Sequence, residues 1–265
     1  MHQKTVNVEI QIGTWMAALG ALVGKGLRLG SYIDIGSADG YLGLAFWRAG
    51  LFRDISIINI DANPLYEPSL RKIRDAIGGD YRICAVDERP GTIELHGSAH
   101  PYWASAVPRD DPYWTSVNGQ IGQTTVVPCR TLDSIVEELD LKSPYAIKLD
   151  IQGLEARALR SGPRTLAGAA VVICESIIHN FRDIHAELDK AGFVLHDLTD
   201  LFRTPEHTLG QFYATYLHRD YASFRASRQW AAADNEAVIA QQHQRRKDLL
   251  EKIDALLFRI EGDRK

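Results

Sequence analysis

S-Y-I-D-I-G-S-A-D-G-Y, residues 31–41, is the stretch that decides the fold of this chain. The apolar run at its start suits a buried strand. Gly36 permits a tight turn after that strand, and Gly40 allows close backbone approach where an apolar helical pattern begins at 42–49. Strand, glycine loop and helix in this order are typical of a nucleotide-binding α/β domain, whose loop wraps the ligand and points backbone amides towards it.

The loop differs from a dinucleotide fingerprint. That fingerprint needs G-x-G-x-x-G, whereas residues 34–40 read D-x-G-x-A-x-G, with Asp34 inside the end of the strand. A pyrophosphate favours glycine amides and a helix N-terminus without a nearby carboxylate, so an acid at this place fits a cationic or neutral ligand better. The aminoacyl end of S-adenosylmethionine is such a ligand. The alternative at this point is a glycine-rich turn of an ordinary α/β protein.

The composition excludes several classes of protein. Of the 265 residues 45% are hydrophobic and 24% are charged, and the net charge of −4 gives no electrostatic case for binding nucleic acid or an anionic membrane. The apolar stretch at 15–23 is too short for a membrane span and lacks the pattern of a signal peptide. Cys84, Cys129 and Cys174 are far apart, which favours buried thiols over zinc or disulfides. We therefore expect a cytoplasmic protein.

Composition and periodicity divide the chain into three parts. Residues 1–29 are expected to form an N-terminal addition, with a half-exposed strand at 6–12 and then a helix capped by Thr14. The α/β domain spans 30–219. The extension at 220–265 is expected to be helical, and its apolar stripe either packs on its own domain or forms a homodimer contact.

Two further strand ends carry acids suited to a nucleoside. The β-branched run at 55–60 predicts a central parallel strand, and Asp61 at its end is placed to accept hydrogen bonds from two ribose hydroxyls. A turn aspartate before the Asn-Pro that follows is the alternative. The next predicted strand, at 81–86, precedes Asp87, which is placed to accept a hydrogen bond from an adenine amine.

Charges inside the next main strand need partners. Residues 145–151 read Y-A-I-K-L-D-I, which places Lys148 and Asp150 on one face of a strand. A buried charge is costly unless it is paired, so Lys148 is expected to pair with Asp150, or with Glu175 at the end of the following strand. Asp150 lies at the carboxyl end of its strand, where open α/β sheets bind ligands.

Aromatic residues crowd the aperiodic segment 97–122, among prolines and polar groups. A long insertion of this kind is usually functional or disordered, and the aromatic density argues against disorder. Aromatic faces with interleaved polar groups suit a sugar ring or another flat hydroxylated substrate, and a satellite hydrophobic cluster is the alternative. The predicted substrate-binding residues are Tyr102, Trp103, Ser105 and Trp114, together with Gln152.

These motifs together resemble the FkbM-type family of S-adenosylmethionine-dependent methyltransferases. The family patterns D-V-G-A-N-x-G, F-E-P-N-P, L-D-S and K-I-D-V-E/Q-G-x-E are similar to residues 34–40, 60–64, 132–134 and 148–155. A Leu-x-x-G tail at 159–162, Glu175 and Asp197-Leu198 also fit the family. The chain departs from it at Ser37-Ala38, where the family has Ala-Asn, and at Asp61, where the family has Glu.

The resemblance implies a Rossmann-like, seven-stranded class I methyltransferase fold at 30–219, mostly parallel with an antiparallel last strand. It implies S-adenosylmethionine as the cofactor and O-methylation of a hydroxyl, often on a saccharide or a secondary metabolite. The predicted cofactor-binding residues are Asp34, Gly36, Ser37, Gly40, Tyr41, Asp61, Ala62 and Asp87.

The catalytic prediction concerns proton removal. Methyl transfer from a sulfonium is a direct displacement, so the protein supplies mainly alignment, and a base takes the hydroxyl proton. Asp150 is the candidate base; the alternative is that it holds Lys148 or orients the donor. His100 is a second candidate, because imidazole titrates near neutrality. Asp110-Asp111 is an acid pair that with Asp150 would suit a metal, but adjacent loop acids are usually solvated, and no metal site is predicted.

Three other functions compete with this interpretation. The glycine loop disfavours a nicotinamide dehydrogenase. An amino-group methyltransferase would carry Asn/Asp-Pro-Pro-Tyr/Phe after the fourth strand; residues 63–66, N-P-L-Y, resemble that motif but follow the second strand. A non-catalytic module would bind S-adenosylmethionine, or use the C-terminal helix for assembly, without transferring the methyl group to an acceptor.

Overall fold

The computed structural model describes residues 13–98, 102–110, 121–224, 239–241 and 243–248. The chain divides into two units, Met1–Phe224 and Arg225–Lys265. The predicted strand at 6–12 lies outside the described residues. In the second unit residues 239–241 and 243–248 are helical, and the remainder of the predicted C-terminal helix, with its proposed dimer contact, lies outside them.

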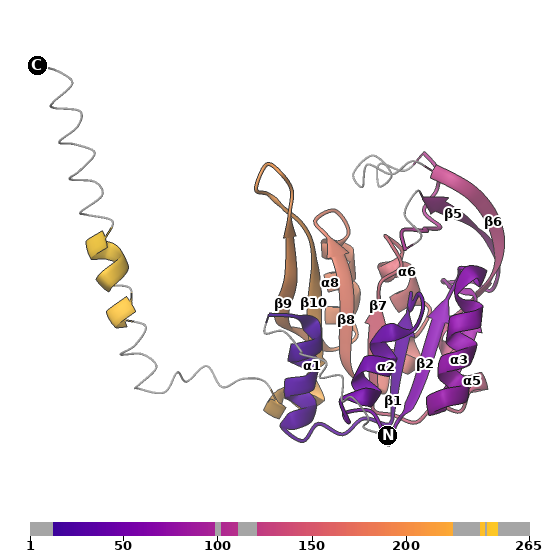
Figure 1. Ribbon diagram of the computed structural model, residues 1–265, viewed down its shortest axis with the longest axis horizontal. Helices are drawn as coiled ribbons and strands as arrows, with labels where there is room; N and C mark the ends of the chain where they lie inside the picture. Colours follow the sequence, from indigo (N-terminus) through magenta and orange to yellow (C-terminus); the bar gives the residue numbers. More distant parts are fainter. Residues whose placement is uncertain (1–12, 99–101, 111–120, 225–238, 242, 249–265) are drawn as a thin grey trace, which may run out of the picture. The chain divides into compact units, whose positions relative to one another are not determined.

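A seven-stranded sheet forms the centre of the first unit (Figure 1), in the order β3-β2-β1-β7-β8-β10-β9. β1 pairs in parallel with β2 and β7, whereas β10 runs antiparallel to β8 and β9. The predicted class I methyltransferase topology, mostly parallel with an antiparallel end, is confirmed. The strands are β1 (Ser31–Ile35), β2 (Ser56–Asp61), β3 (Asp80–Ile83), β7 (Tyr145–Leu149), β8 (Ala169–Ile177), β9 (Phe193–Arg203) and β10 (Leu209–His218).

Helices cover both faces of this sheet, which explains why β1 and β7 are buried along their whole length. Alternate side chains of β1 enter different cores: Ile33 packs with side chains of α5, α6 and α8, and Tyr32 packs with those of α1 and α2. The helices are α1 (Trp15–Gly24), α2 (Tyr41–Arg48), α3 (Glu67–Ile77), α5 (Leu132–Glu138), α6 (Glu155–Arg160), α7 (Pro163–Ala167) and α8 (Phe181–Lys190), with 3-10 turns η1 (Pro64–Tyr66) and η2 (Arg219–Phe224).

The predicted strand at 81–86 is two strands. β3 ends at Ile83, and β4 (Ala85–Val86) leaves the main sheet to pair in parallel with β6 (Ile121–Arg130), which pairs antiparallel with β5 (Gly91–Ser98). This three-stranded sheet, in the order β4-β6-β5, lies at the end of the main sheet where β3 finishes (Figure 1). It has its own apolar core, in which Leu95, Ala106 and Val127 pack. Part of the aromatic segment is therefore anchored to a sheet.

α7 follows α6 directly in the sequence. α6 ends at Arg160, with Ser161 as its C-cap, and Pro163 occupies the first turn of α7. Proline suits that position because its missing N–H would have no partner within the helix. Asp133 accepts hydrogen bonds from the Thr165 N–H at 2.8 Å and the Thr165 hydroxyl at 2.7 Å. The L-D-S motif thus holds the start of α7.

Among the described residues, no helix combines the length and the apolar character needed to cross a bilayer.

Candidate functional site

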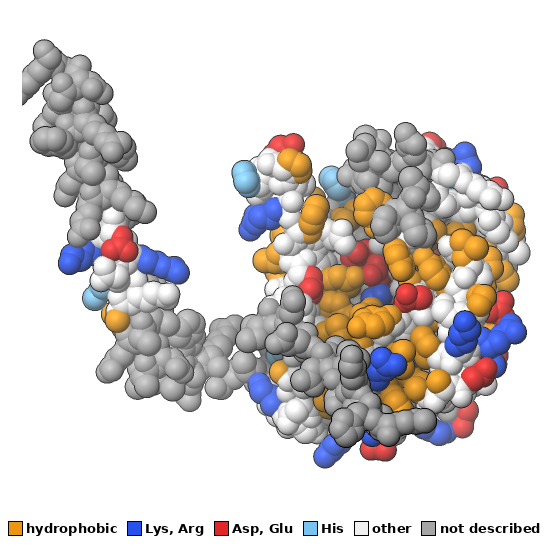
Figure 2. All heavy atoms as spheres, viewed as in Figure 1, with side chains coloured by type: hydrophobic (Ala, Val, Ile, Leu, Met, Phe, Trp, Pro, Cys, Tyr) orange, Lys and Arg blue, Asp and Glu red, His pale blue; other side chains and the backbone are white. Residues whose placement is uncertain are grey.

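The carboxyl ends of β1, β2 and β7 surround a cavity, together with residues of the small sheet and of the aromatic segment. Figure 2 shows acidic side chains among hydrophobic ones near the centre of this face, between the β9–β10 hairpin and the three-stranded sheet. The cavity is lined by Ile35, Gly36, Ala38, Ile60, Asp61, Ala62, Asn63, Tyr66, Cys84, Ala85, Val86, Leu95, Tyr102, Ala104, Ser105, Ala106, Asp150, Ile151, Gln152 and Leu154.

Gly36 brings the glycine loop against the end of β7. Its φ of +77° lies in the left-handed region, and a Cβ at this position would stand 1.8 Å from the backbone oxygen of Asp150. The N–H of Asp150 also donates to the carbonyl oxygen of Ile35 at 3.0 Å. Glycine is therefore required here both for the backbone angle and for the close approach of two strand ends.

Asp61 joins the glycine loop to the turn after β2. One carboxylate oxygen accepts from the Ala38 N–H at 2.7 Å, and the other accepts from the Asn63 N–H at 2.8 Å. Burial raises the pKa of Asp61 to about 6, although these two donors act to lower it. The carboxylate has the turn contact that was the alternative interpretation, and it also lines the cavity, where its predicted role towards a ribose remains a prediction.

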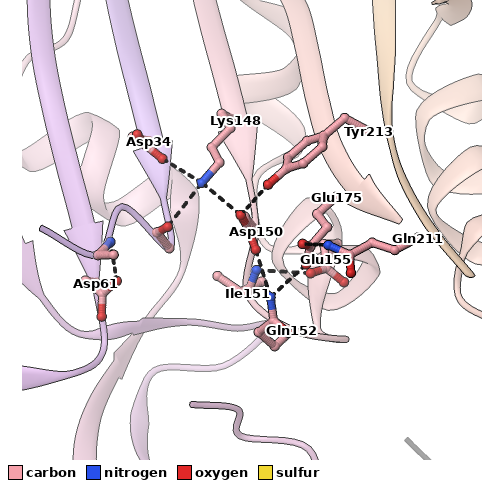
Figure 3. A network of polar contacts seen from close by, with 12 residues as sticks. Asp34, Asp61, Lys148, Asp150, Ile151, Gln152, Glu155, Glu175, Gln211 and Tyr213 are labelled. Carbon is pink, nitrogen blue, oxygen red and sulfur yellow. Dashed lines mark hydrogen bonds and ion pairs between the residues drawn. The ribbon is translucent and has the colours of Figure 1, made fainter. Parts of the chain in front are cut away.

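Lys148 lies at the centre of a buried charged cluster (Figure 3). Its ammonium contacts Asp34 at 3.2 Å and Asp150 at 3.3 Å, and donates to the carbonyl oxygen of Gly36 at 3.1 Å. Burial acts to lower the pKa of Lys148, but the carboxylates of Asp150 and Asp34 outweigh it and raise the pKa above its usual value. The sequence identified Asp150 as a partner and missed Asp34, which is opposite Lys148 in the β1–β7 register.

Asp150 is held by several donors at the edge of the cavity. Its Oδ2 accepts from the Tyr213 hydroxyl at 2.6 Å, and its Oδ1 accepts from the Gln152 amide at 2.9 Å. Burial acts to raise the pKa of Asp150, but Lys148, a hydrogen bond with Glu175 and these donors lower it below its usual value. A carboxylate with a lowered pKa is a weak base. These contacts support the alternative in which Asp150 holds Lys148, and its role as the base remains a prediction.

Glu175 is joined to Asp150 through the side-chain amide of Gln152. The Gln152 side-chain nitrogen that donates to Asp150 also donates to Glu175 at 2.7 Å, and the Gln211 amide donates to the other oxygen of Glu175. Burial, followed by the Asp150 carboxylate, raises the pKa of Glu175 well above its usual value. The Gln152 amide is thus directed at carboxyl groups, and its predicted contact with substrate remains untested.

Glu155 fixes the turn between β7 and α6. It is 1% exposed and accepts from the N–H of Ile151 at 3.0 Å, from the N–H of Gly153 at 3.2 Å and from the Asn180 amide at 2.9 Å. Burial raises the pKa of Glu155 to about 7. Glu155, Gln211 and Tyr213 are absent from the predicted site residues. Of the three, only Glu155 lies in a sequence motif that could have identified it, at the end of the pattern at 148–155.

The aromatic segment contributes one side of the cavity. The rings of Tyr102 and Tyr66 stack, with centroids 5.9 Å apart and planes inclined by 16°. Ser105 is buried, and its hydroxyl donates to the backbone oxygen of Gln152 at 2.7 Å. Trp103 is exposed and is not part of the cavity lining. His100 and Trp114 lie outside the described residues, so their predicted roles are not addressed by the structure.

Other predicted cofactor residues lie away from the cavity wall. Asp34 is fully buried behind it, and Asp87 forms an ion pair with Arg157. Gly40 has a φ of +78° at the start of α2, and Tyr41 is exposed. The structure brings Gly36, Asp61, Ala62 and Asp150 to one cavity, and it does not bring Asp34, Ser37, Gly40, Tyr41 or Asp87 to its lining.

A family model described as the methyltransferase FkbM domain matches residues 34–195, more than half of the chain. The chain belongs to the FkbM methyltransferase family. Membership confirms the resemblance carried by the motifs, and it makes S-adenosylmethionine the cofactor of this chain, as predicted. No curated protein matches the sequence.

Several solved structures are similar to this FkbM-family chain. Methyltransferase FkbM from Methylobacillus flagellatus KT is 16% identical with a TM-score of 0.47; the match covers 72% of this chain and 45% of that one, so this chain spans less than half of its length. Precorrin-6y C5,15-methyltransferase from Geobacter metallireducens GS-15 is 12% identical with a TM-score of 0.41, and the match covers 76% of this chain and 85% of that one. Ribosomal protein L11 methylase from Lactobacillus delbrueckii subsp. bulgaricus is 10% identical with a TM-score of 0.39, and the match covers 77% of this chain and 76% of that one.

The residues around the cavity fit S-adenosylmethionine. The wall at residues 84–86 is apolar, as a purine base requires, and Asp61 lies on the same lining. Asp150 adds negative charge suited to the cationic end of the molecule. Ser37 has a buried hydroxyl with no hydrogen-bond partner within the described part of the chain, in the loop beside the cavity. Such a polar atom is costly unless a ligand or water satisfies it.

Proposed function

We propose that the chain is an S-adenosylmethionine-dependent O-methyltransferase that acts on a hydroxyl of a saccharide or of a glycosylated or secondary metabolite. The observation that carries the proposal is the single cavity on which the glycine loop, Asp61 and Asp150 converge. The cofactor supplies an electrophilic methyl group, and the protein supplies alignment and a place for the hydroxyl proton.

The acceptor assignment rests on the aromatic segment. Tyr102 lines the cavity and is exposed, and the neighbouring Trp103 is exposed as well. Exposed aromatic rings beside polar groups favour a sugar or another flat hydroxylated ring. Ser105 bonds this segment to the turn that carries Gln152, and both Tyr102 and Gln152 line the cavity. These contacts support a small hydroxylated acceptor.

The test is calorimetric titration of S-adenosylmethionine and S-adenosylhomocysteine into the wild type and into Asp61→Ala, followed by a screen of sugars for methyl transfer. We expect both ligands to bind and the variant to bind about tenfold more weakly, because a charged hydrogen bond is lost. Absence of binding to the folded wild type would refute the donor assignment. Binding with transfer only to amines would favour an amino-group methyltransferase, and binding with no transfer would favour a non-catalytic module.

A further inference from the structure

The charged cluster behind the cavity holds more acid than base. Within the described residues the buried ammonium of Lys148 interacts with three carboxyl groups, those of Asp34, Asp150 and Glu175, and a fourth, Glu155, acts on Asp150 and Glu175. The ion pairs of this ammonium go to Asp34 and Asp150. Carboxylates that share a site disfavour one another's ionisation, so the excess negative charge is relieved when one of them keeps a proton.

The contacts indicate which carboxyl group keeps the proton. Asp150 has the Lys148 ammonium at 3.3 Å and the Tyr213 hydroxyl at 2.6 Å to stabilise its negative charge. Glu175 accepts hydrogen bonds from two neutral amides, those of Gln152 at 2.7 Å and of Gln211, and it is also hydrogen-bonded to Asp150. One amide nitrogen of Gln152 reaches both carboxyl groups, so the two lie close together. The shared proton therefore belongs on Glu175.

Burial and charges on neighbouring elements act on Glu175. Burial and the carboxylate of Asp150, which directly follows β7, disfavour its ionisation most; Glu155 on α6 adds to this, and Lys148 on β7 favours ionisation. The hydroxyl of Tyr213 on β10 interacts with both Asp150 and Glu175. Lys148 is the cation that favours the ionised form of Glu175, so a second positive charge beside Asp150 would favour loss of the Glu175 proton.

We propose that Glu175 is a specificity-determining residue of the donor cavity: it gives up the proton it shares with Asp150 when a ligand with a positively charged sulfur enters, and keeps it when the sulfur is neutral. Asp150 and Gln152 line the cavity, and Glu175 lies one contact behind them. In this step the O–H bond of Glu175 breaks, the proton passes to the solvent, and the carboxylate remains to stabilise the added charge.

The consequence is a pH-dependent preference for donor over product. This inference rests on the proposed function, because it takes S-adenosylmethionine as the ligand. S-Adenosylhomocysteine lacks the methyl group and the positive charge at sulfur, so it is the matched neutral ligand. A proton released on binding makes the affinity rise with pH. The ratio of the two affinities should therefore increase with pH, and it should be independent of pH in Glu175→Gln.

The experiment is calorimetry with both ligands in two buffers of different ionisation enthalpy, from about pH 6 to pH 9. We expect S-adenosylmethionine to release about half a proton or more per site at the optimum, and S-adenosylhomocysteine to release clearly less. Glu175→Gln should bind S-adenosylmethionine without releasing more protons than S-adenosylhomocysteine does. Difference infrared spectra should show a protonated carboxylic acid band that S-adenosylmethionine removes in the wild type, which tests the proposal even if the variant does not fold.

Glu155→Gln is the matched control, because Glu155 is also a buried acid but bonds to the backbone of the turn instead of to Asp150. Proton release should persist in this variant. Equal release by the two ligands, release that survives in Glu175→Gln, or release that is lost in Glu155→Gln would each overturn the inference. These outcomes are distinct from failure of the proposed function, in which the folded wild type binds neither ligand.

Discussion

Replacing Lys148 with methionine removes the ammonium that Asp34 and Asp150 share, while keeping a side chain of similar length. Lys148 is 1% exposed and Asp34 is 0% exposed, so water cannot take the place of the lost charge. Asp34 then keeps the Tyr32 hydroxyl at 3.3 Å as a donor. Removing one partner of a buried ion pair costs about 3–5 kcal/mol. We expect Lys148→Met to lower the free energy of unfolding by this amount at about pH 7.5.

The stability that Lys148→Met loses should be smaller at lower pH. Burial already raises the pKa of Asp34 against the opposing effect of Lys148, and without the ammonium its folded-state pKa moves further above the unfolded value. A carboxyl group with a raised folded pKa stabilises the fold at low pH and loses that contribution as the pH rises through the folded pKa. Each unit corresponds to about 1.4 kcal/mol, so at about pH 5.5 the variant should recover up to about 2–3 kcal/mol.

Chemical denaturation followed by tryptophan fluorescence measures both quantities, because the chain contains five tryptophans. Lys142→Met is the matched control: its ammonium pairs with Asp140, and the two side chains are 69% and 88% exposed. That change should cost less than about 0.5 kcal/mol. Combining Lys148→Met with Asp34→Asn should restore part of the stability. A loss below about 1 kcal/mol, or an equal loss at both pH values, would refute the reasoning.

Three further predictions follow from single contacts. Gly36→Ala should lower the free energy of unfolding by about 3 kcal/mol or more, because the new Cβ would stand 1.8 Å from a backbone oxygen. Gly78→Ala is the control: its φ of +80° is similar, but its Cβ would meet no atom within 4 Å, so thermal unfolding should show a cost of only about 1–2 kcal/mol. Burial raises the pKa of Glu155 to about 7, so its contribution to stability is present below about pH 4.5 and is lost as the pH rises towards 7. Denaturation of Glu155→Gln at a series of pH values should show that up to about 3 kcal/mol of this pH dependence has disappeared. Ser105→Ala removes the donor to the backbone oxygen of Gln152 and should cost about 1 kcal/mol and weaken S-adenosylmethionine binding in calorimetry; unchanged affinity would contradict it.

Elements with a clear period and clear end signals could be predicted from the sequence. The helix Glu67–Ile77 is of this kind, because Gly78 and Gly79 follow it directly, and Phe181–Lys190 is another, with Gly192 close behind its last residue. The small sheet could not be predicted, because residues 81–86, Y-R-I-C-A-V, contain no glycine or proline to mark the point where β4 changes sheet. Its partner, β6, is distant in sequence, and pairing over that distance leaves no local pattern.

The site could be predicted as a set of strand ends but not as a set of contacts. The apolar runs place Asp61 and Asp150 at carboxyl ends, and parallel strands bring such ends together. What each carboxylate bonds to depends on neighbours from other strands: Tyr213 and Gln211 come from β10, whose sequence reads only as a strand. Asp150 was therefore a reasonable candidate base in sequence, although its contacts in the structure are those of a group that holds a buried lysine.

The two motifs that carry the family resemblance, at residues 34–40 and 148–155, contact each other in the structure. D-x-G ends β1 and K-x-D ends β7, and the strand register sets Asp34 opposite Lys148. Lys148 then bonds to the Gly36 carbonyl, and the missing side chain of Gly36 admits the backbone of Asp150. A lysine inside a parallel strand is tolerated because the first motif supplies an acid and a carbonyl oxygen, and the glycine loop is held in place because the second motif supplies the ammonium. A change to either motif should therefore act through the other, even at residues that line no part of the cavity.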